Sequence, residues 1–536
     1  MILLSFPHHG IRRTLGLVRS NDVKNMGREA QQEAFMKRAV VLIFLCLSLF
    51  LNLQPAQAAP KDTVVIAQGI DPTTMDPHMR WDTGAINILM NIYDFLLTRA
   101  PDLKIEPLLA SSYRIVNDTT WELNLRRGVK FQNGEEFNAA AVKFSLERLA
   151  DPKNKLQQTA LQIIERVDII NDYRVHVITK KPFPYLDAQL TNVGAVIPPK
   201  YFQEKGLSHF SLVPVGTGPY KLVRWAKDDQ LEMEANPNYW RGVPRIKRAI
   251  FRPIPEDTSR VAGLQTQELD VIVNIPPNLA GLMNWKGRSG VAKIPSARTV
   301  FLVLENTTGG PTADVRVRRA IAQAIDQDKI IKNILEGNAV KLASPLSKHQ
   351  FGYDPSIKPY DYNPAEAKKL LAEAGYPNGF DLPINSPSGR YLKDKEVVEA
   401  IMGDLRKVGI NATIRVLEWG SYMTQLYARK LGPAYLLGWG GLTFDADGTF
   451  YPLFRTGQAL SNFSSPRLDA LLEQARSTMD RQKRLQLYAE ASKVIKDEVP
   501  CAFVYQQVDI YGVSDRLNWK PRPDERLFVF DMDFKK

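Results

Sequence analysis

The sequence predicts an α/β fold, and three observations support this class. The chain has 536 residues, of which 44% are hydrophobic and 24% are charged, a composition typical of globular proteins with two or three compact units. Short runs with strand-like alternation come early in the chain. In the second half, amphipathic helical patterns alternate with apolar strand-like runs, and this alternation is typical of α/β lobes.

The first element that we expect is a signal peptide over residues 36–58. Lys37 and Arg38 form a positive segment, residues 39–53 form an apolar run, and Ala56-Gln57-Ala58 is a small-x-small cleavage pattern. The mature chain would then begin near Ala59. The alternative is a membrane anchor, but the run is shorter than the roughly 20 apolar residues that span a bilayer.

Residues 1–35 precede this signal and its own Met36. We therefore expect them to be an over-extended start. Cys46 lies in the apolar run of the signal, so cleavage would leave Cys501 alone, without an internal disulfide. Cys501 lies in an apolar stretch and is expected to be buried and inert. Export through a signal peptide predicts a periplasmic protein.

The formal net charge is +12. The basic residues are scattered, without runs and without interleaved aromatic residues. This pattern is typical of a solvated surface and argues against a nucleic-acid site. We find no tandem repeat and no low-complexity linker.

Strands dominate the predicted elements of the first half. Residues 62–69 and 119–131 have strand patterns, and residues 138–151 read as a helix capped by Asn138. Residues 172–186 predict a strand that ends in a turn marked by proline, and 214–240 predict a glycine-rich turn followed by a hairpin.

Helices dominate the second half. Residues 314–335 predict two helices with a break near Asp326, and residues 363–376 predict a helix with Asn363 as its cap and Gly375 at its end. A helix and a strand that runs into Trp419 are expected over 394–419. The last predicted elements are helices over 465–480 and 481–500 and a strand over 501–513.

Several kinds of catalytic motif are missing. The chain has no phosphate-binding loop and no Gly-x-Ser-x-Gly elbow, and its six histidines are dispersed. The stretch "LLGWGGLTFDADGTF" (436–450) holds two carboxylates, Asp445 and Asp447. Its spacing departs from the calcium-loop pattern. A secreted hydrolase using both carboxylates is an alternative, although side chains two apart on an extended segment point to opposite faces. We expect no cofactor, no metal and no catalysis.

From about residue 62 to the C-terminus, blocks of sequence resemble the extracytoplasmic solute-binding proteins of ABC importers, in the class that binds peptides, glutathione, opines or nickel. The matching blocks occur in the family's order: "DPTTMDPH", "WELNLRRGVKFQNGEEFNAAAVKFSLER", "PVGTGPYKLVRW", "NPNYW", "DVRVRRAIAQAID", "YNPAEAKKLLAEAGY" and "RVLEWGSYMTQL".

The resemblance implies a two-lobed periplasmic-binding-protein fold (type II, cluster C-like) with an extra small domain and a cleft that closes about a hinge. On that pattern, lobe I takes 59–90, 213–300 and 506–536, the extra domain takes 91–212, and lobe II takes 301–505. It further implies a monomer that captures a small peptide or related carboxylate-bearing solute, such as a glutathione- or opine-like compound. The solute would pass to a membrane permease and its ATPase at the inner membrane.

The resemblance also implies ligand contacts. Arg390, followed by Tyr391, stands where dipeptide binders pair an arginine with the ligand carboxylate. Trp439 would form an aromatic wall of the cleft. The segment after it would line the cleft, with Gly440 and Gly441 allowing close approach of the ligand. Three further candidates are Asp445, Trp81 and Trp419.

In peptide-binding relatives, an aspartate three residues after the tryptophan accepts the α-ammonium group. In this sequence that position is Leu442, so the usual partner of a free amine is missing, and a buried ammonium without a carboxylate is costly. Two alternatives stay open: a nickel-chelate binder within the family, and an accessory chaperone or sensor that binds a partner protein.

Overall fold

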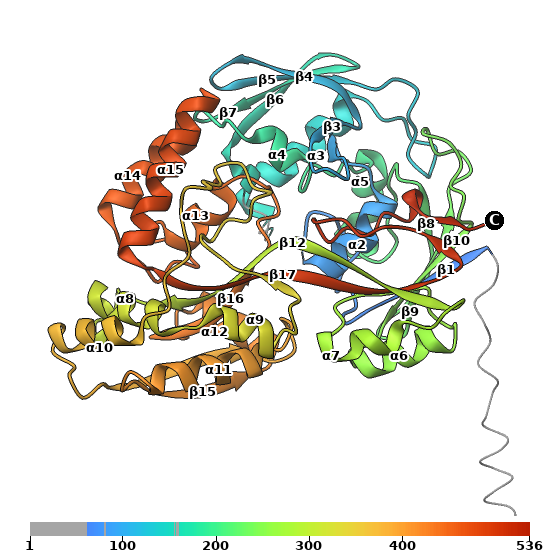
Figure 1. Ribbon diagram of the computed structural model, residues 1–536. Coiled ribbons are helices and arrows are strands. Elements are labelled where there is room, and N and C mark those ends of the chain that lie inside the picture. The colour runs from blue at the N-terminus through green and yellow to red at the C-terminus, as the bar shows by residue number, and fades with distance from the viewer. Residues whose placement is uncertain (1–61, 80–81, 155, 157–159) are drawn as a thin grey trace, which may run out of the picture. The chain divides into compact units, whose positions relative to one another are not determined.

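The computed structural model describes residues 62–79, 82–154, 156 and 160–536 (Figure 1). The predicted signal peptide, the expected over-extended start and Trp81 lie outside the described residues. Among the residues that are described, no helix combines the length and the apolar character that crossing a bilayer requires.

Within the described residues, eleven strands form one mixed sheet. Strand β13 (Ala339–Val340) pairs with β17 and is not part of the linear strand order of the sheet. The other ten strands lie in the order β15 (Asn411–Leu417), β14 (Asp381–Pro387), β16 (Ala434–Trp439), β12 (Ser289–Leu304), β17 (Cys501–Ser514), β11 (Val271–Ile272), β1 (Thr63–Gln68), β10 (Arg248–Pro253), β9 (Gln230–Ala235) and β8 (Tyr220–Ala226).

The two long strands β12 and β17 join two groups of strands in this sheet. They run antiparallel and side by side, from Ser289 opposite Ser514 to Val303 opposite Cys501 (Figure 1). Strand β16 pairs with the second half of β12, whereas β11 pairs with the end of β17. The register shifts between Pro295 and Thr299. The chain therefore crosses from one group of strands to the other along two adjacent strands.

Buried strands of this sheet have the apolar runs that the sequence predicts. All six residues of β1 are buried, and β1 pairs in parallel with β10 and β11. A strand covered on both faces needs a continuous apolar run, because side chains on both of its faces lie in the core. Strands β8 and β9 form the hairpin predicted over 214–240.

A separate four-stranded sheet has the order β4 (Ala110–Asn117), β5 (Thr120–Leu125), β7 (Arg174–Thr179), β6 (Ile164–Asn171). Its own hydrophobic cluster includes Trp121, Leu123 and Val177. The alternation of apolar and polar residues in 119–125 reflects a sheet with one buried face. Two short pairs complete the strands: β2 (Leu97–Arg99) with β3 (Ile105–Pro107), and β18 (Leu517–Asn518) with β19 (Asp533–Phe534).

The helices begin at residues with suitable caps. Asn138 and Asn363 accept backbone N–H groups at the starts of α3 and α10, as predicted, and Asp326 caps α9 at the predicted break. The helices are α2 (Thr83–Ile92), α3 (Ala139–Ala150), α4 (Leu186–Leu190), α5 (Pro199–Phe210), α6 (Asp257–Gln265), α7 (Pro277–Ala280), α8 (Val315–Ala324), α9 (Gln327–Asn333), α10 (Pro364–Glu373), α11 (Asp394–Arg406), α12 (Trp419–Tyr427), α13 (Asp447–Phe454), α14 (Pro466–Ser477) and α15 (Arg481–Glu498).

One boundary differs from the prediction. The strand expected to run into Trp419 ends at Leu417, and Trp419 begins α12 instead. The Glu418 carboxylate accepts the N–H groups of Gly420 and Ser421, which starts the helix there. Asp447 likewise lies in the first turn of α13. The expectation of an extended segment through both Asp445 and Asp447 is therefore wrong.

Buried apolar residues form three large clusters. One includes residues of β12, β16 and α13–α15, a second belongs to the four-stranded sheet, and a third includes residues of β1, α2 and β10. Cys501 lies buried in the first cluster, and burial raises the pKa of its thiol well above the usual value. The predicted α/β class is confirmed, whereas the boundaries of the two lobes and the extra domain stay predictions.

Candidate functional site

The stretch 436–450 leaves the sheet beside the crossing strands. Trp439 ends β16 and pairs with Thr299 of β12. Gly440 follows directly, and a Cβ placed on it would lie 3.5 Å from a guanidinium nitrogen of Arg298. The chain then passes through Leu442 into a loop that ends at α13. These residues therefore lie next to the part of β12 whose register shifts.

Arg390 lies in the loop between β14 and α11. The Asp394 carboxylate fixes this loop, since it accepts the backbone N–H groups of Gly389, Arg390 and Tyr391 at 3.3, 2.9 and 3.2 Å. The guanidinium carbon of Arg390 lies 5.3 Å from the centre of the Tyr391 ring and 5.2 Å from that of Trp419. Cation–π contacts of this kind orient the guanidinium without neutralising it.

In the described ranges, Glu525 and Asp82 act on Arg390 through their charges, but no carboxylate lies within ion-pair distance of its guanidinium. Its side chain is partly exposed, and no ion pair or hydrogen bond to its guanidinium is found among residues 62–79, 82–154, 156 and 160–536. Burial and the like charge of Arg298 lower its pKa. An oriented guanidinium with unused donors suits a carboxylate ligand, which it can bind through two parallel hydrogen bonds.

The two aromatic residues beside Arg390 differ in exposure. Tyr391 is 5% exposed, and its hydroxyl donates to the Gly438 carbonyl at 3.3 Å. Trp419 is partly exposed, stacks on Tyr422 and contacts Tyr391 edge-on. Tyr391 is thus packed as a support for Arg390, whereas Trp419 keeps surface that a ligand could contact.

A buried ion pair lies beside these residues. Arg298 of β12 holds Glu525 through two hydrogen bonds, at 3.1 and 2.9 Å. Burial alone would raise the pKa of Glu525, but the charges of Arg298, Arg390 and Arg526 hold it below its usual value. Burial and the charge of Glu525 raise the pKa of the neighbouring Asp509 above its usual value.

Leu442 lines a cavity of about 20 Å³, which is room for about one water molecule. Two of the charged residues that line it, Arg522 and Asp524, pair with each other at 2.7 and 3.0 Å. Arg99 and Arg526 also line it. A solute of dipeptide size therefore fits only if the surrounding segments move apart.

Four charged residues of this region were not predicted from the sequence, because no local pattern distinguishes them from surface charges. They are Arg99, Arg298, Arg526 and Glu525.

The other predicted residues of this stretch make contacts within the protein. Trp439 is partly exposed, and its indole N–H donates to the Gly448 carbonyl at 2.9 Å. Gly441 has φ +53°, and a Cβ on it would lie 2.2 Å from the side-chain nitrogen of Gln350. Packing against Gln350 and the left-handed backbone therefore explain Gly441 without a ligand.

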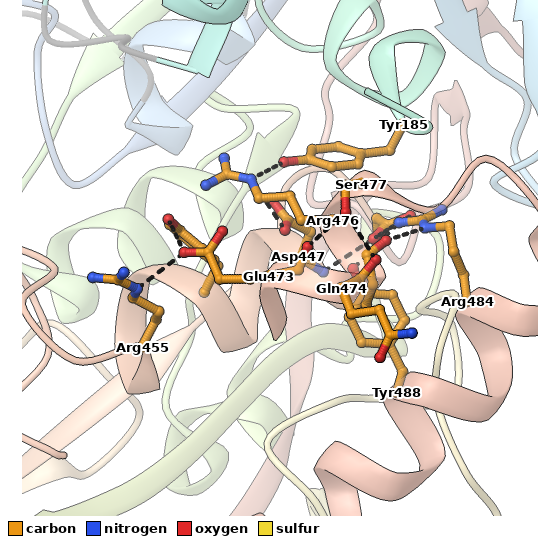
Figure 2. Close-up of polar contacts among 12 residues, drawn as sticks. Tyr185, Asp447, Arg455, Glu473, Gln474, Arg476, Ser477, Arg484 and Tyr488 are labelled. Carbon is orange, nitrogen blue, oxygen red and sulfur yellow. Dashed lines mark hydrogen bonds and ion pairs between the residues drawn. The ribbon is translucent and has the colours of Figure 1, made fainter. Parts of the chain in front are cut away.

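Asp445 is buried and already has a cation partner. Both of its oxygens accept from Nη2 of Arg484, at 2.9 and 3.0 Å, and one also accepts the N–H of Asp447. Arg484 comes from α15 and also donates to the Tyr488 hydroxyl (Figure 2). Because its carboxylate is engaged in this way, Asp445 is not carried into the ligand site that we propose.

Asp447 faces a different arginine. Nε of Arg476 lies 3.5 Å from its carboxylate and also donates to the Tyr185 hydroxyl at 3.0 Å (Figure 2). Burial raises the pKa of Asp447 to about 6, against the opposing charge of Arg476. Asp445 and Asp447 are thus each paired with their own arginine, and their geometry is that of two structural ion pairs.

Among the described residues, no group of three or more His, Cys, Asp or Glu side chains is placed to hold a metal ion.

Comparisons with known proteins show to which family the chain belongs. The sequence profile of the bacterial extracellular solute-binding proteins, family 5 (middle region), matches residues 104–461. The glutathione-binding protein GsiB of Pectobacterium atrosepticum is 31% identical over 487 residues, which cover 88% of this chain and 94% of that protein.

Two solved structures show the similarity of fold. The dipeptide-binding protein of Pseudoalteromonas sp. SM9913, in complex with Met-Leu, is 25% identical with a TM-score of 0.80, covering 88% of this chain and 100% of that one. MoaA of A. tumefaciens R10, in complex with mannopinic acid, is 26% identical with a TM-score of 0.78, covering 89% of this chain and 100% of that one. The predicted two-lobed fold of periplasmic binding proteins is confirmed by these structures.

Proposed function

Because the chain belongs to the bacterial extracellular solute-binding proteins of family 5, we propose that it captures a small peptide or a related carboxylate-bearing solute and delivers it to an ABC permease. The solute would be a glutathione- or opine-like compound. Members of this family bind solutes for ABC transporters. The identity of the solute and the residues that hold it are the new parts of the proposal.

The observation that carries the proposal is the state of Arg390. Its guanidinium is oriented by two aromatic rings, its loop is fixed by Asp394, and among the described residues no carboxylate lies within ion-pair distance of it. A partly buried cation is stabilised by an anion that binds beside it. The carboxylate of the solute would supply this anion, and Trp419 would cover an apolar part of the solute.

The similar proteins support this ligand class. GsiB is described as glutathione-binding, and the two similar structures hold Met-Leu and mannopinic acid. Leu442 lines the cavity, and the sequence resemblance implies that peptide-binding relatives have an amine acceptor at this position. An ordinary dipeptide would therefore find no carboxylate at position 442 for its α-ammonium group, and a solute such as glutathione would place its ammonium group away from Leu442.

We further propose that the protein acts in the periplasm as a monomer and without catalysis. A signal peptide over 36–58 would export it, with the mature chain beginning near Ala59. The lobes would take 59–90, 213–300 and 506–536, and 301–505, with 91–212 as the extra domain. Because the cavity is only about 20 Å³, the cleft would have to open to admit the solute. It would then close around the solute, since the solute contacts both sides of the cleft only in the closed state.

Native mass spectrometry tests the proposal. The protein would be isolated from the periplasm of a bacterial host and measured before and after mild unfolding. We expect a retained small molecule with at least one carboxylate in the wild-type protein and none in Arg390→Gln. Arg467→Gln removes the same charge from an exposed position and should retain the molecule. Equal retention by Arg390→Gln, or a retained molecule without a carboxylate, would contradict the proposed site.

A further inference from the structure

Arg526 is a buried cation whose donors are only partly used. It is 5% exposed, and Nη2 donates to Oδ1 of Asn192 at 2.9 Å. Nη1 is buried and has no hydrogen-bond partner among the described residues. Arg526 and Asn192 both line the cavity beside Leu442. An unsatisfied donor on a buried charge is costly, so this arrangement points to an anion that binds in the cavity.

Arg99 brings a second guanidinium to the same cavity. It donates to the carbonyls of Leu103 and Thr443, and its guanidinium carbon lies 4.9 Å from the centre of the Phe444 ring. Its Nε is buried and has no hydrogen-bond partner within the described part of the chain. Burial lowers the pKa of Arg99 to about 10, so its charge is retained at pH 7.

Two carboxylates near the cavity are hydrogen-bonded to other arginines. Asp524 accepts two hydrogen bonds from Arg522, and Glu525 accepts two from Arg298. Across the described ranges, neither Arg99 nor Arg526 forms an ion pair with a carboxylate. Asp524 and Glu525 act on Arg526 through their charges, and Asp187, Asp524 and Asp445 act on Arg99. The unused donors of both arginines therefore remain open to a carboxylate of the solute.

We propose that the cavity beside Leu442 is a second anion subsite, in which Arg526 and Arg99 hold one carboxylate of the solute while Arg390 holds another. The solute is then a dicarboxylate, and Leu442 and Phe444 supply an apolar part of the cavity wall. This inference rests on the proposed function and deepens it. It also accounts for Leu442, because an aspartate at that position would repel the incoming carboxylate.

Three probes separate a dicarboxylate site from a general peptide site. Glutathione has two carboxylates. Its analogue γ-aminobutyryl-cysteinyl-glycine lacks only the α-carboxylate, and the dipeptide Met-Leu has one carboxylate. Calorimetry would measure the binding of each probe to the ligand-free full-length protein under reducing conditions. The variants are Arg526→Gln, Arg526→Met and the exposed control Arg467→Gln.

We expect the wild-type protein to bind glutathione about 100-fold more tightly than either monocarboxylate probe, since a buried charge pair is lost in those complexes. Arg526→Gln and Arg526→Met should lose this preference, and Arg467→Gln should keep it. The ligand-free Arg526 variants should melt at or above the wild-type temperature, because they remove a buried charge that lacks a full set of partners. A purely structural role for Arg526 predicts a lower melting temperature instead.

Two results would overturn the inference: Met-Leu binding as tightly as glutathione, or Arg526→Gln discriminating among the probes as the wild type does. If Met-Leu binds tightly and Arg390→Gln abolishes that binding, the second subsite is wrong while the proposed function stands. If none of the three probes binds and no solute is retained by the isolated protein, both proposals fail.

Discussion

The buried pair of Asp445 and Arg484 allows a sharp test of structural against ligand-binding roles. Asp445→Asn keeps the volume of the side chain and an oxygen for the N–H of Asp447, but it removes the negative charge. The side chains of the pair are 6% and 4% exposed, so Arg484 would remain as a buried cation without its carboxylate. Breaking a buried pair by removal of one partner costs about 3–5 kcal/mol.

We therefore expect Asp445→Asn to lower the free energy of unfolding by about 3–5 kcal/mol, with solute affinity changed by less than about 3-fold, or under 1 kcal/mol. Urea denaturation followed by tryptophan fluorescence measures the first quantity, and calorimetry with the recovered solute measures the second. The double variant Asp445→Asn/Arg484→Met should recover much of the lost stability. A loss below about 1 kcal/mol together with a solute affinity about 10-fold weaker would refute this reasoning and make Asp445 a ligand residue.

Three further predictions concern buried groups. Burial and the charge of Arg148 lower the pKa of His78 to about 4. The contribution of His78 to stability is therefore present above pH 6.5 and falls by about 3 kcal/mol as the pH drops through 4. Denaturation between pH 4 and 7 should show that the stability of His78→Gln depends less on pH than that of the wild type. The raised pKa of Asp447, about 6, acts in the opposite direction. The contribution of Asp447 to stability is present below pH 4 and falls by about 3 kcal/mol as the pH rises through 6. Asp447→Asn at pH 8 should therefore be at least as stable as the wild type. A large loss of stability at pH 8 would contradict the assignment. Gly441→Ala should lower the free energy of unfolding by about 2–3 kcal/mol, since φ is +53° and the new Cβ would meet Gln350. We expect thermal denaturation to show a lower melting temperature, while the solute preference stays unchanged. An unchanged melting temperature would argue against the packing role.

Helices with local signals were predictable from the sequence. Asn138 and Asn363 cap the helices that they were expected to cap, since a cap depends on residues two or three positions away. The crossing strand β12 was not found from its own residues. Its first half, up to Pro295, mixes charged and partly exposed positions, whereas its second half is buried throughout. Long-range pairing with β17 decides its conformation, and periodicity cannot show that pairing.

The candidate site was predictable only in part. Arg390 was inferred from the resemblance, by its place before the helix that follows it, and its role as a ligand contact stays a prediction. Arg99 and Arg526 could not be found, since the fold brings them to one cavity from segments more than 400 residues apart. The partner of Asp445 was missed for the same reason. Arg484 lies 39 residues further along the chain, on a helix that the sequence predicts but does not place.

The central claim is that Arg390 holds the carboxylate of a solute in this cleft. Calorimetry tests it most directly, with the solute recovered from the wild-type protein titrated into wild type, Arg390→Gln and Arg467→Gln at pH 7.5. We predict binding at least about 30-fold weaker in Arg390→Gln, because loss of one member of a buried charge pair costs about 2 kcal/mol or more, and unchanged binding in the control. Equal affinity in wild type and Arg390→Gln would contradict the claim.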